Sequence, residues 1–386
     1  MAVDKGQFTD VAAVARALRP SYPVYCVRPD VLAAGARRFI SQFPGTVLYA
    51  VKCNPHPLVL GALYKGGIRH FDTASLTEIA QVSDSFDDAH TYFMHPVKAR
   101  AVIKSAYQVY GVRHFVVDHI DELNKVVEEV GAAGNTIIVR VNTPPADDTL
   151  YHLAAKFGAT PEAAAELMAA ASAKGCAVGL AFHVGSQCRS PEAYLSALDL
   201  LGQVIAKAGV APVCVDVGGG FPAAYGDRPV PALDDYMAAI RRGLKQLKLS
   251  PTVEVFAEPG RALVAQGCSL LTQVQLRKDD RLYINDGIYG SLSEMNTVAI
   301  RLPARVIRLD GAVSASLAEF SLNGPTCDSL DVLPGTFALP DDVREGDWIE
   351  IDQVGAYSNA LATRFNGFHP ETFVQVFDAP PALAAA

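Results

Sequence analysis

Long apolar runs and a surplus of basic residues are both missing from this chain. No stretch reaches the roughly 18 uninterrupted apolar residues that a membrane-spanning helix needs. The first residues, MAVDKGQFTD, lack the basic-then-apolar order of a signal peptide. The formal net charge is -8, with charges of both signs interspersed, so the sequence lacks the basic footprint of a nucleic-acid binder. We therefore expect no nucleic-acid or membrane partner and a cytoplasmic location.

The cysteines lack a pattern. Their number, seven, is odd, and no two of them have CxxC spacing. They stand at positions 26, 53, 176, 188, 214, 268 and 327. This distribution argues against a disulfide framework and against a zinc site, so we expect no metal.

The chain has enough apolar sequence for a large core. Of its 386 residues 50% are hydrophobic, and single cores rarely grow beyond about 250–300 residues. The length therefore predicts two domains. We place the first at residues 27–265 and form the second from residues 1–26 together with 266–386.

Short apolar runs bounded by turn residues alternate with helix-like segments through the first domain. The predicted strands are 46–52, 70–75, 91–95, 115–118, 136–142, 180–186, 213–219 and 253–260. One helix-like segment, TPEAAAELMAAASAKG (160–175), has a Thr-Pro start and a Gly stop. Alternating strands and helices indicate an α/β fold with a parallel sheet, and eight repeats predict a closed (β/α)8 TIM-like barrel.

After about residue 265 the alternation of strand-like and helix-like segments ends. Short β-rich runs follow one another between Gly, Pro and Asp turns: SLLTQVQL, RLYIND, ARVIRL, DWIEIDQVG and TFVQVF. A similar run, PVYCVRP (23–29), precedes the barrel. We predict a second, mostly β domain, a sandwich or barrel, built from both ends of the chain.

Polar residues stand where the predicted barrel strands end. In VLYAVKCNPHP (47–57) an apolar run leads into Lys52, where a core would favour leucine. The carboxyl ends of barrel strands meet at the active site. The candidates at these ends are Lys52, Asp72, Ser75, Arg140, His183, Ser186, Gly218, Gly219, Gly220, Glu258 and Arg261. Each alone has a structural explanation, such as a solvated lysine, a core histidine or half of a salt bridge, but together they predict one site.

The run Gly218 to Gly220 suggests the ligand. Three residues without Cβ expose backbone N–H groups to an anion, although such a run can also be a simple tight turn. Arg261 adds a cationic fork suited to phosphate. A phosphate pocket facing Lys52 suggests pyridoxal phosphate held as a Schiff base, with Glu258 on the ring nitrogen and His183 stacked on the ring.

Eight motifs in this order resemble one family. They are YAVKCN, FDTAS, FHVGSQ, VDVGGGFP, AEPGR, NDGIYGS, GPTCDSLD and GAYSNALATRFNGF. Together, from about residue 23 to about residue 370, they resemble the fold-type III pyridoxal-phosphate-dependent decarboxylases, closest to the ornithine/lysine decarboxylase branch. This resemblance implies a carbon–carbon lyase with pyridoxal 5'-phosphate as cofactor.

The resemblance also implies roles for individual residues. Lys52 would carry the cofactor, His183 would stack on its ring, and Glu258 would hold the ring nitrogen. The implied phosphate ligands are Gly218, Gly219, Gly220, Arg261, Ser186 and Tyr357. Asp72 and Arg140 match further cofactor-pocket positions.

The resemblance also implies that the GPTCDSLD motif supplies residues that act on the substrate. Cys327 resembles the residue that protonates Cα after carbon dioxide leaves, and Asp328 resembles the carboxylate that binds the distal amine. In the family this motif reaches the active site of the neighbouring subunit, so the resemblance implies a homodimer with shared active sites. A buried structural thiol is the alternative for Cys327.

Substrate choice is where the chain departs from the family pattern. Ornithine enzymes of this branch carry an acidic residue nine positions beyond the tyrosine of NDGxYGS, and counting from Tyr289 leads to Val298. Glu294 on the same segment is a candidate replacement, and we assign Tyr289 and Glu294 to the substrate site with Asp328. If Arg301 faces inward, it would instead favour a substrate with an anionic end. An equally open alternative is that both Glu294 and Arg301 point to solvent. Asn323 also stands where an aromatic residue is common.

We predict decarboxylation of a basic L-amino acid, of ornithine or lysine type, to a diamine and carbon dioxide, as in polyamine biosynthesis. The alternatives are another substrate (diaminopimelate, diaminobutyrate or a non-basic side chain) and a non-catalytic homologue that binds a partner protein. Diaminopimelate is disfavoured because PTCDSLD replaces that branch's CESxD pattern. Racemases pair the ring nitrogen with arginine, whereas Glu258 creates a strong electron sink.

Overall fold

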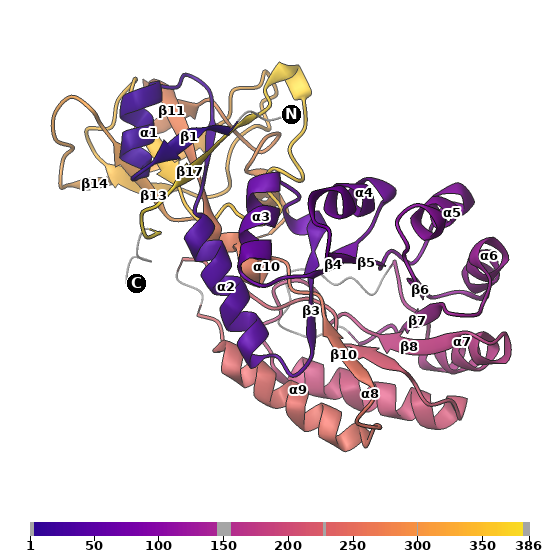
Figure 1. Cartoon of the computed structure of the whole chain (residues 1–386). Coiled ribbons are helices and arrows are strands. Elements are labelled where there is room, and N and C mark those ends of the chain that lie inside the picture. Colours follow the sequence, from indigo (N-terminus) through magenta and orange to yellow (C-terminus); the bar gives the residue numbers. More distant parts are fainter. Residues whose placement is uncertain (1–3, 145–155, 227–228, 299, 381–386) are drawn as a thin grey trace.

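The structure is a computed structural model that describes residues 4–144, 156–226, 229–298 and 300–380. Figure 1 shows two bodies, a ring of strands and helices and a compact group of strands beside it. The β-rich group contains both the first and the last strand of the chain, β1 (Asp4–Phe8) and β17 (Thr372–Val376), which pair in parallel.

The ring is a closed barrel of eight parallel strands, as predicted. The strand order is β10-β3-β4-β5-β6-β7-β8-β9, and β10 pairs with β3 to close it. The strands are β3 (Thr46–Ala50), β4 (His70–Thr73), β5 (His90–Phe93), β6 (His114–Val117), β7 (Thr136–Arg140), β8 (Ala177–Ala181), β9 (Cys214–Asp216) and β10 (Glu254–Ala257). Strand β8 ends at Ala181, earlier than expected, so His183 and Ser186 lie on the loop after the strand.

Helices cover the outside of the barrel (Figure 1). They are α2 (Pro29–Gln42), α3 (Pro57–Lys65), α4 (Leu76–Ser85), α5 (Arg100–Gln108), α6 (Ile120–Val130), α7 (Pro161–Ala173), α8 (Glu192–Ala208), α9 (Leu233–Leu247) and α10 (Arg261–Val264). The predicted Thr-Pro helix start is confirmed in α7, where the side chain of Thr160 accepts a hydrogen bond from the Ala163 N–H. Ser75 caps α4 in the same way through the Glu78 N–H.

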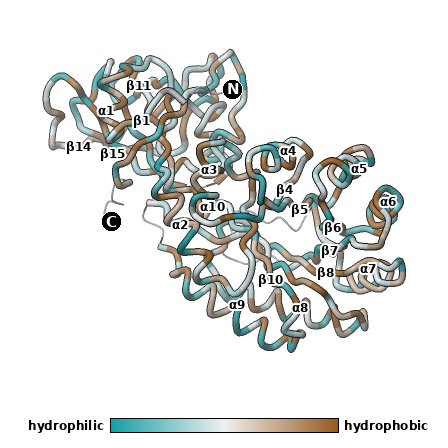
Figure 2. The backbone as a smooth tube through the Cα atoms, in the orientation of Figure 1, coloured by the Kyte–Doolittle hydropathy of each residue, from teal (hydrophilic) through white to brown (hydrophobic). Residues whose placement is uncertain are grey.

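The barrel interior is apolar at its centre. Leu48, Val116, Ile138 and Phe256, from four different strands, form one buried cluster there. Figure 2 shows the strands as mostly hydrophobic and the outer helices as mixed. Each such side chain contributes about 1.5–3 kcal/mol through its burial, which makes the barrel a rigid support for the loops at its strand ends.

The second body is a nine-stranded sheet. Its main path is β1-β17-β2-β11-β12-β14-β15, with β16 joining β11 and β13. The strands after β1 are β2 (Val24–Val27), β11 (Cys268–Lys278), β12 (Arg281–Ile284), β13 (Ala304–Ile307), β14 (Leu317–Asn323), β15 (Phe337–Pro340), β16 (Trp348–Ile351) and β17. All six runs predicted as strands are confirmed. Strands β1, β14 and β15 and helix α1 (Val11–Leu18) are additional to the predicted elements.

A buried ion network ties the second body together. The Arg28 guanidinium, at the end of β2, pairs with Glu350 at 2.8 Å, with Asp352 at 3.4 Å and with Asp378 at 3.0 Å. It thereby joins an early strand, β16 and the segment after β17. Among the described residues, no helix is both long and apolar enough to cross a membrane.

Candidate active site

Lys52 lies in the short 3-10 helix η1 (Val51–Cys53) that follows β3, and its amine contacts the Asp72 carboxylate of β4. Asp72 is buried, whereas the Lys52 side chain is 42% exposed. Partial loss of water lowers the pKa of the amine, but the Asp72 and Glu258 carboxylates outweigh this effect and raise the pKa above its ordinary value. Without a ligand, Lys52 is therefore a protonated amine held against a carboxylate.

Glu258 follows β10 and interacts with Asp216, which ends β9. Burial raises the pKa of both carboxyl groups, and repulsion by Asp216 and Asp72 raises that of Glu258 further. Hydrogen bonds with the Gly218 N–H and with Glu258 only partly offset the rise at Asp216. One oxygen of Asp216 accepts a hydrogen bond from the Gly218 N–H at 2.7 Å, and the other has no partner in the described part of the chain. This pair therefore readily retains a proton close to Lys52.

His183 presents a neutral ring at the same end of the barrel. Burial, Arg140 and Lys52 lower the pKa of this imidazole well below its ordinary value. The Gly185 N–H donates to its Nδ1 at 3.0 Å, which leaves Nε2 as the nitrogen that carries the proton. A neutral imidazole can stack on an aromatic ring without placing a second cation beside Lys52.

The three glycines after β9 form a cradle that no larger residue fits. A Cβ on Gly218 would stand 2.1 Å from the Phe182 carbonyl oxygen, and one on Gly219 would stand 3.1 Å from His183 Nε2. Gly218 has φ +66° and Gly220 has φ +97°, a left-handed conformation that favours glycine. The N–H groups of Gly219 and Gly220 donate to no other group in the described part of the chain. They are available to an anion.

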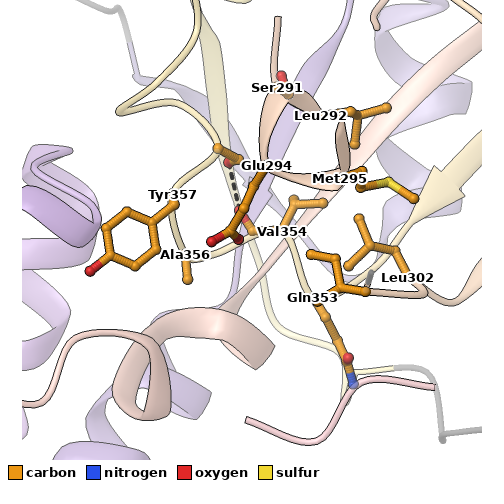
Figure 3. A pocket seen from close by; sticks show the side chains of 11 residues that line it. Ser291, Leu292, Glu294, Met295, Leu302, Gln353, Val354, Ala356 and Tyr357 are labelled. Carbon is orange, nitrogen blue, oxygen red and sulfur yellow. Dashed lines mark hydrogen bonds between the residues drawn. The ribbon is translucent and has the colours of Figure 1, made fainter. Parts of the chain in front are cut away.

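Arg261 begins α10 beside this cradle. Its Nη1 donates to the Tyr225 hydroxyl at 2.9 Å and its Nη2 to the Ser186 hydroxyl at 3.4 Å, while both nitrogens pair with the Glu294 carboxylate. The ring of Tyr357 lies 5.1 Å from the guanidinium carbon. Figure 3 shows Glu294 extending from the 291–295 segment toward Tyr357. Three expected phosphate ligands therefore lie together, and Glu294 lies with them.

Arg140 and the substrate residues lie on other elements. Arg140 ends β7, and its guanidinium lies 5.7 Å from the ring of Phe157. In the second body, the Tyr289 hydroxyl donates to the Asp328 carboxylate, and Cys327 is exposed with its N–H bonded to the Asn366 side chain at 3.1 Å. Hydrogen bonds from Tyr289 and the Leu330 N–H lower the pKa of Asp328, so this carboxylate is ionised at neutral pH.

The segment after Tyr289 does not supply a second exposed carboxylate. Val298 is 5% exposed and belongs to the apolar core. Arg301 is exposed, and its Cβ lies close to where a side chain on Gly226 would stand. Asn323 ends β14, where its amide donates to the Leu282 carbonyl at 3.3 Å.

Three residues of the site, Asp216, Tyr225 and Asp331, were not predicted from the sequence. Asp216 stands inside the VDVGGG motif, so its place as a polar residue ending an apolar strand is a usable signal. Tyr225 gives no signal, because its contact with Arg261 joins distant loops. Asp331 is buried and accepts hydrogen bonds from the Thr326 N–H, the Thr326 hydroxyl and the Ile288 N–H. It thereby fastens the Cys327 loop to the loop that carries Tyr289.

These residues fit pyridoxal phosphate. The side-chain-free cradle and the unpartnered Arg261 Nε suit its phosphate, the Lys52 amine suits its carbonyl carbon, and the proton-retaining Glu258 suits its ring nitrogen. The neutral His183 suits its ring face.

Comparisons with known proteins also indicate a pyridoxal-dependent enzyme. A family model described as "Pyridoxal-dependent decarboxylase, pyridoxal binding domain" matches residues 31–265. The ornithine decarboxylase of Schizosaccharomyces pombe is 32% identical over 343 residues, covering 84% of this chain and 76% of that protein. The lysine/ornithine decarboxylase of Selenomonas ruminantium is 33% identical over 348 residues, covering 88% and 85%. The crystal structure of lysine/ornithine decarboxylase from Vibrio vulnificus complexed with cadaverine has a TM-score of 0.81 and 32% identity, covering 95% of this chain and 98% of that one.

Proposed function

The chain belongs to the pyridoxal-dependent decarboxylases, and from that premise we propose that it converts a basic L-amino acid of ornithine or lysine type to a diamine and carbon dioxide. One observation carries the proposal. At one end of the barrel, the Lys52 amine, the Glu258 carboxyl and the cradle of Gly218 to Gly220 with Arg261 stand together. Relatives named for ornithine and lysine/ornithine decarboxylation align with 84% and 88% of this chain.

Bound pyridoxal phosphate supplies the electron sink that accepts the pair released when the bond from Cα to the carboxylate breaks. Lys52 would hold the carbonyl carbon after passing a proton to Asp72, which already contacts its amine. Glu258 would pass its retained proton to the ring nitrogen and remain there as the counter-ion. His183 would restrain the ring face, and Arg140 would add positive charge at the rim of the pocket.

The substrate is held by the second body in this proposal. Asp328, ionised and oriented by Tyr289, would bind the distal ammonium, and the Cys327 thiol would deliver a proton to Cα. Since Val298 is buried in the core, Asp328 is the carboxylate on which selectivity for a basic side chain rests.

An amine-product assay with added cofactor tests the substrate class. We expect ornithine or lysine to yield its diamine with equimolar carbon dioxide, and K52A to yield neither. Arginine, diaminobutyrate and diaminopimelate are the comparison substrates. If neither ornithine nor lysine reacts while the pyridoxal absorbance on Lys52 persists, the basic-substrate proposal falls and an alternative amino acid takes its place.

We also propose a homodimer with shared sites. Large apolar side chains are exposed around the Cys327 loop, at Leu330, Leu361, Phe365 and Phe368, as expected where a second copy packs. Mixing K52A with C327A should restore about a quarter of the wild-type activity, because half of randomly assorted dimers are mixed and each has one intact site. No recovery after verified subunit exchange would contradict shared sites.

We also propose a domain division and a cellular location. The domain division at 27–265 against 1–26 plus 266–386 is testable by limited proteolysis near its boundaries. None of the seven cysteines forms a disulfide in the described part of the chain, which suits the reducing cytoplasm, and cell fractionation can test this location.

A further inference from the structure

Glu294 pairs with the end of the Arg261 guanidinium that carries Nη1 and Nη2. Nη1 pairs with Oε2 at 2.9 Å and Nη2 pairs with Oε1, so the contact is bidentate. The two side chains are 3% and 8% exposed. A buried bidentate pair fixes the rotation of a long side chain that otherwise has considerable conformational freedom.

The remaining edge of Arg261 is left for another partner. Nε and Nη2 lie on the same side edge of the planar guanidinium, and Nη2 on that edge reaches Ser186 at 3.4 Å. Nε is buried and has no hydrogen-bond partner in the described part of the chain. A buried N–H without an acceptor is costly, so this edge is suited to a ligand oxygen.

Other groups support the same orientation. The Tyr225 hydroxyl accepts from Nη1 on the edge opposite Nε. The rings of Tyr357 and Tyr225 have their centres 5.1 and 5.7 Å from the guanidinium carbon. With its end and one edge occupied, the guanidinium can offer an anion only the Nε–Nη2 edge.

The structure assigns to Glu294 the role of a positioning residue: it holds the end of Arg261 so that the Nε–Nη2 edge faces the phosphate of the cofactor. This inference rests on the proposed function, because it requires pyridoxal phosphate in the cradle of Gly218 to Gly220. It differs from the expected role of Glu294 as a carboxylate for the substrate's distal amine, which stays a prediction.

The arrangement explains how a carboxylate can stand near a phosphate. The pair with Glu294 reduces the net charge of the arginine, so the phosphate is recognised by directed N–H groups of Arg261 and of the glycines more than by charge. An opposite arrangement, with Glu294 competing against the phosphate for the same donors, predicts the reverse effect of removing its charge.

Phosphate discrimination is the quantity to measure. Dissociation constants of pyridoxal phosphate and pyridoxal are obtained by absorbance titration of the cofactor-stripped full chain, and their ratio isolates the phosphate because both aldehydes react with Lys52. We expect E294Q and E294A to reduce the preference for the phosphorylated form by roughly ten-fold, as for a lost charge-assisted contact. E294D should recover part of the preference, and E294Q should have no further effect in an R261A background.

A matched control separates positioning from general stability. Glu350 forms a comparable buried Arg–Glu pair, with Arg28, and E350Q should lower stability without changing the ratio. An unchanged ratio in E294Q overturns the inference, and a change confined to KM for the amino acid gives Glu294 to the substrate instead. A stronger preference of E294Q for the phosphorylated form also overturns it, since Glu294 would then compete with the phosphate. If the wild-type chain shows no pyridoxal absorbance at all, the proposed function itself fails.

Discussion

Asp72 controls the protonation of the lysine that the barrel presents at its mouth. Its buried carboxylate contacts the Lys52 amine, and with Glu258 it raises the pKa of that amine above its ordinary value. The amine must lose its proton before it can capture an aldehyde. Asp72 therefore holds Lys52 in place at the cost of lowering its reactive fraction in the cofactor-free protein.

We predict that D72N shifts the pH dependence of pyridoxal phosphate capture downward by roughly 1–3 pH units, the usual effect of one close carboxylate. The sign follows because loss of the carboxylate lowers the pKa of the amine and leaves more free base at neutral pH. Stopped-flow absorbance between pH 6 and about 10 measures the rate. D88N is the control, because Asp88 pairs with Arg69 on the surface; a D72N profile that overlays the wild type would contradict the prediction.

Asp331 is a positioning residue for the substrate half of the site. Its carboxylate accepts hydrogen bonds at 3.0 Å from the Thr326 N–H, at 2.7 Å from the Thr326 hydroxyl and at 3.0 Å from the Ile288 N–H. Gly287 and Gly324 leave the space that it occupies, since a Cβ on either would stand 2.2 Å from one of its oxygens. The placement of Cys327 and Asp328 depends on this carboxylate.

We predict that D331A lowers kcat at least about ten-fold and stability by about 1–3 kcal/mol, because three donors lose their acceptor. Cofactor affinity should stay at the wild-type value, since the cradle lies in the barrel. Steady-state kinetics, urea unfolding and pyridoxal phosphate titration measure the three quantities. D347A, which breaks a buried pair with Arg308, should lose stability and keep kcat; equal loss of kcat in both variants would argue against a positioning role.

At the scale of elements, the loop after β9 packs against the loops after β8 and β10. The Gly218 carbonyl accepts from the Glu258 N–H at 2.8 Å, and the Gly220 carbonyl accepts from the Cys188 N–H at 2.8 Å. The Tyr194 hydroxyl donates to the Gly219 carbonyl at 2.8 Å. These bonds engage the carbonyls and leave the N–H groups of Gly219 and Gly220 directed elsewhere, which creates the anion cradle.

We predict that G218A destabilises the protein by about 3 kcal/mol or more, because its Cβ would overlap the Phe182 carbonyl and its φ is positive. Cofactor affinity should fall with it. G61A is the matched control, since nothing lies within 4 Å of a Cβ at that position in α3; it should stabilise by about 0.5–1 kcal/mol. Denaturant unfolding measures the stability of both variants. A G218A variant as stable as the wild type would refute the claim that the cradle requires glycine at position 218.

At the scale of the whole molecule, the two ends of the barrel carry different chemistry. His70, His90 and His114 begin three neighbouring strands, at the end opposite the candidate site. The rings of His70 and His90 stack at 4.9 Å, and His114 packs against Tyr92 at 4.6 Å. Burial, followed by the neighbouring histidines, lowers the pKa of His114 to about 4.

We predict that H114F removes part of the acid sensitivity of folding. Between about pH 6.5 and 4 the unfolded chain protonates this histidine while the folded chain does not, so the wild type loses stability as the pH falls through that window. One partly solvated histidine ring accounts for about 1–2 kcal/mol of the stability lost over this pH range. Urea midpoints from pH 7 to about 4.5 measure it. An H114F slope equal to the wild type would contradict the prediction.

Sequence alone determined the parallel barrel, the β-rich partner and the cofactor chemistry. Apolar runs with helical segments between them favour a parallel sheet, eight of them favour its closure into a barrel, and parallel strands bring their carboxyl ends together. Lys52, Asp72, His183 and Glu258 can therefore be grouped from the order of the strands along the chain. The spacing of VDVGGGFP and AEPGR points to an anion site because glycine backbones and arginine forks are chemically specific.

Only the tertiary structure decided which polar groups touch. The pair of Arg261 with Glu294 joins residues 33 positions apart on different bodies, and Asp331 reaches Ile288 across 43 positions. No local pattern encodes such contacts, because each depends on how loops from separate elements pack. The early end of β8 has the same origin: its paired register with β7 and β9 ends at Ala181, whereas the apolar pattern of the sequence continues. Local chemistry thus specified the cofactor, and packing between distant segments specified how its binding residues are held.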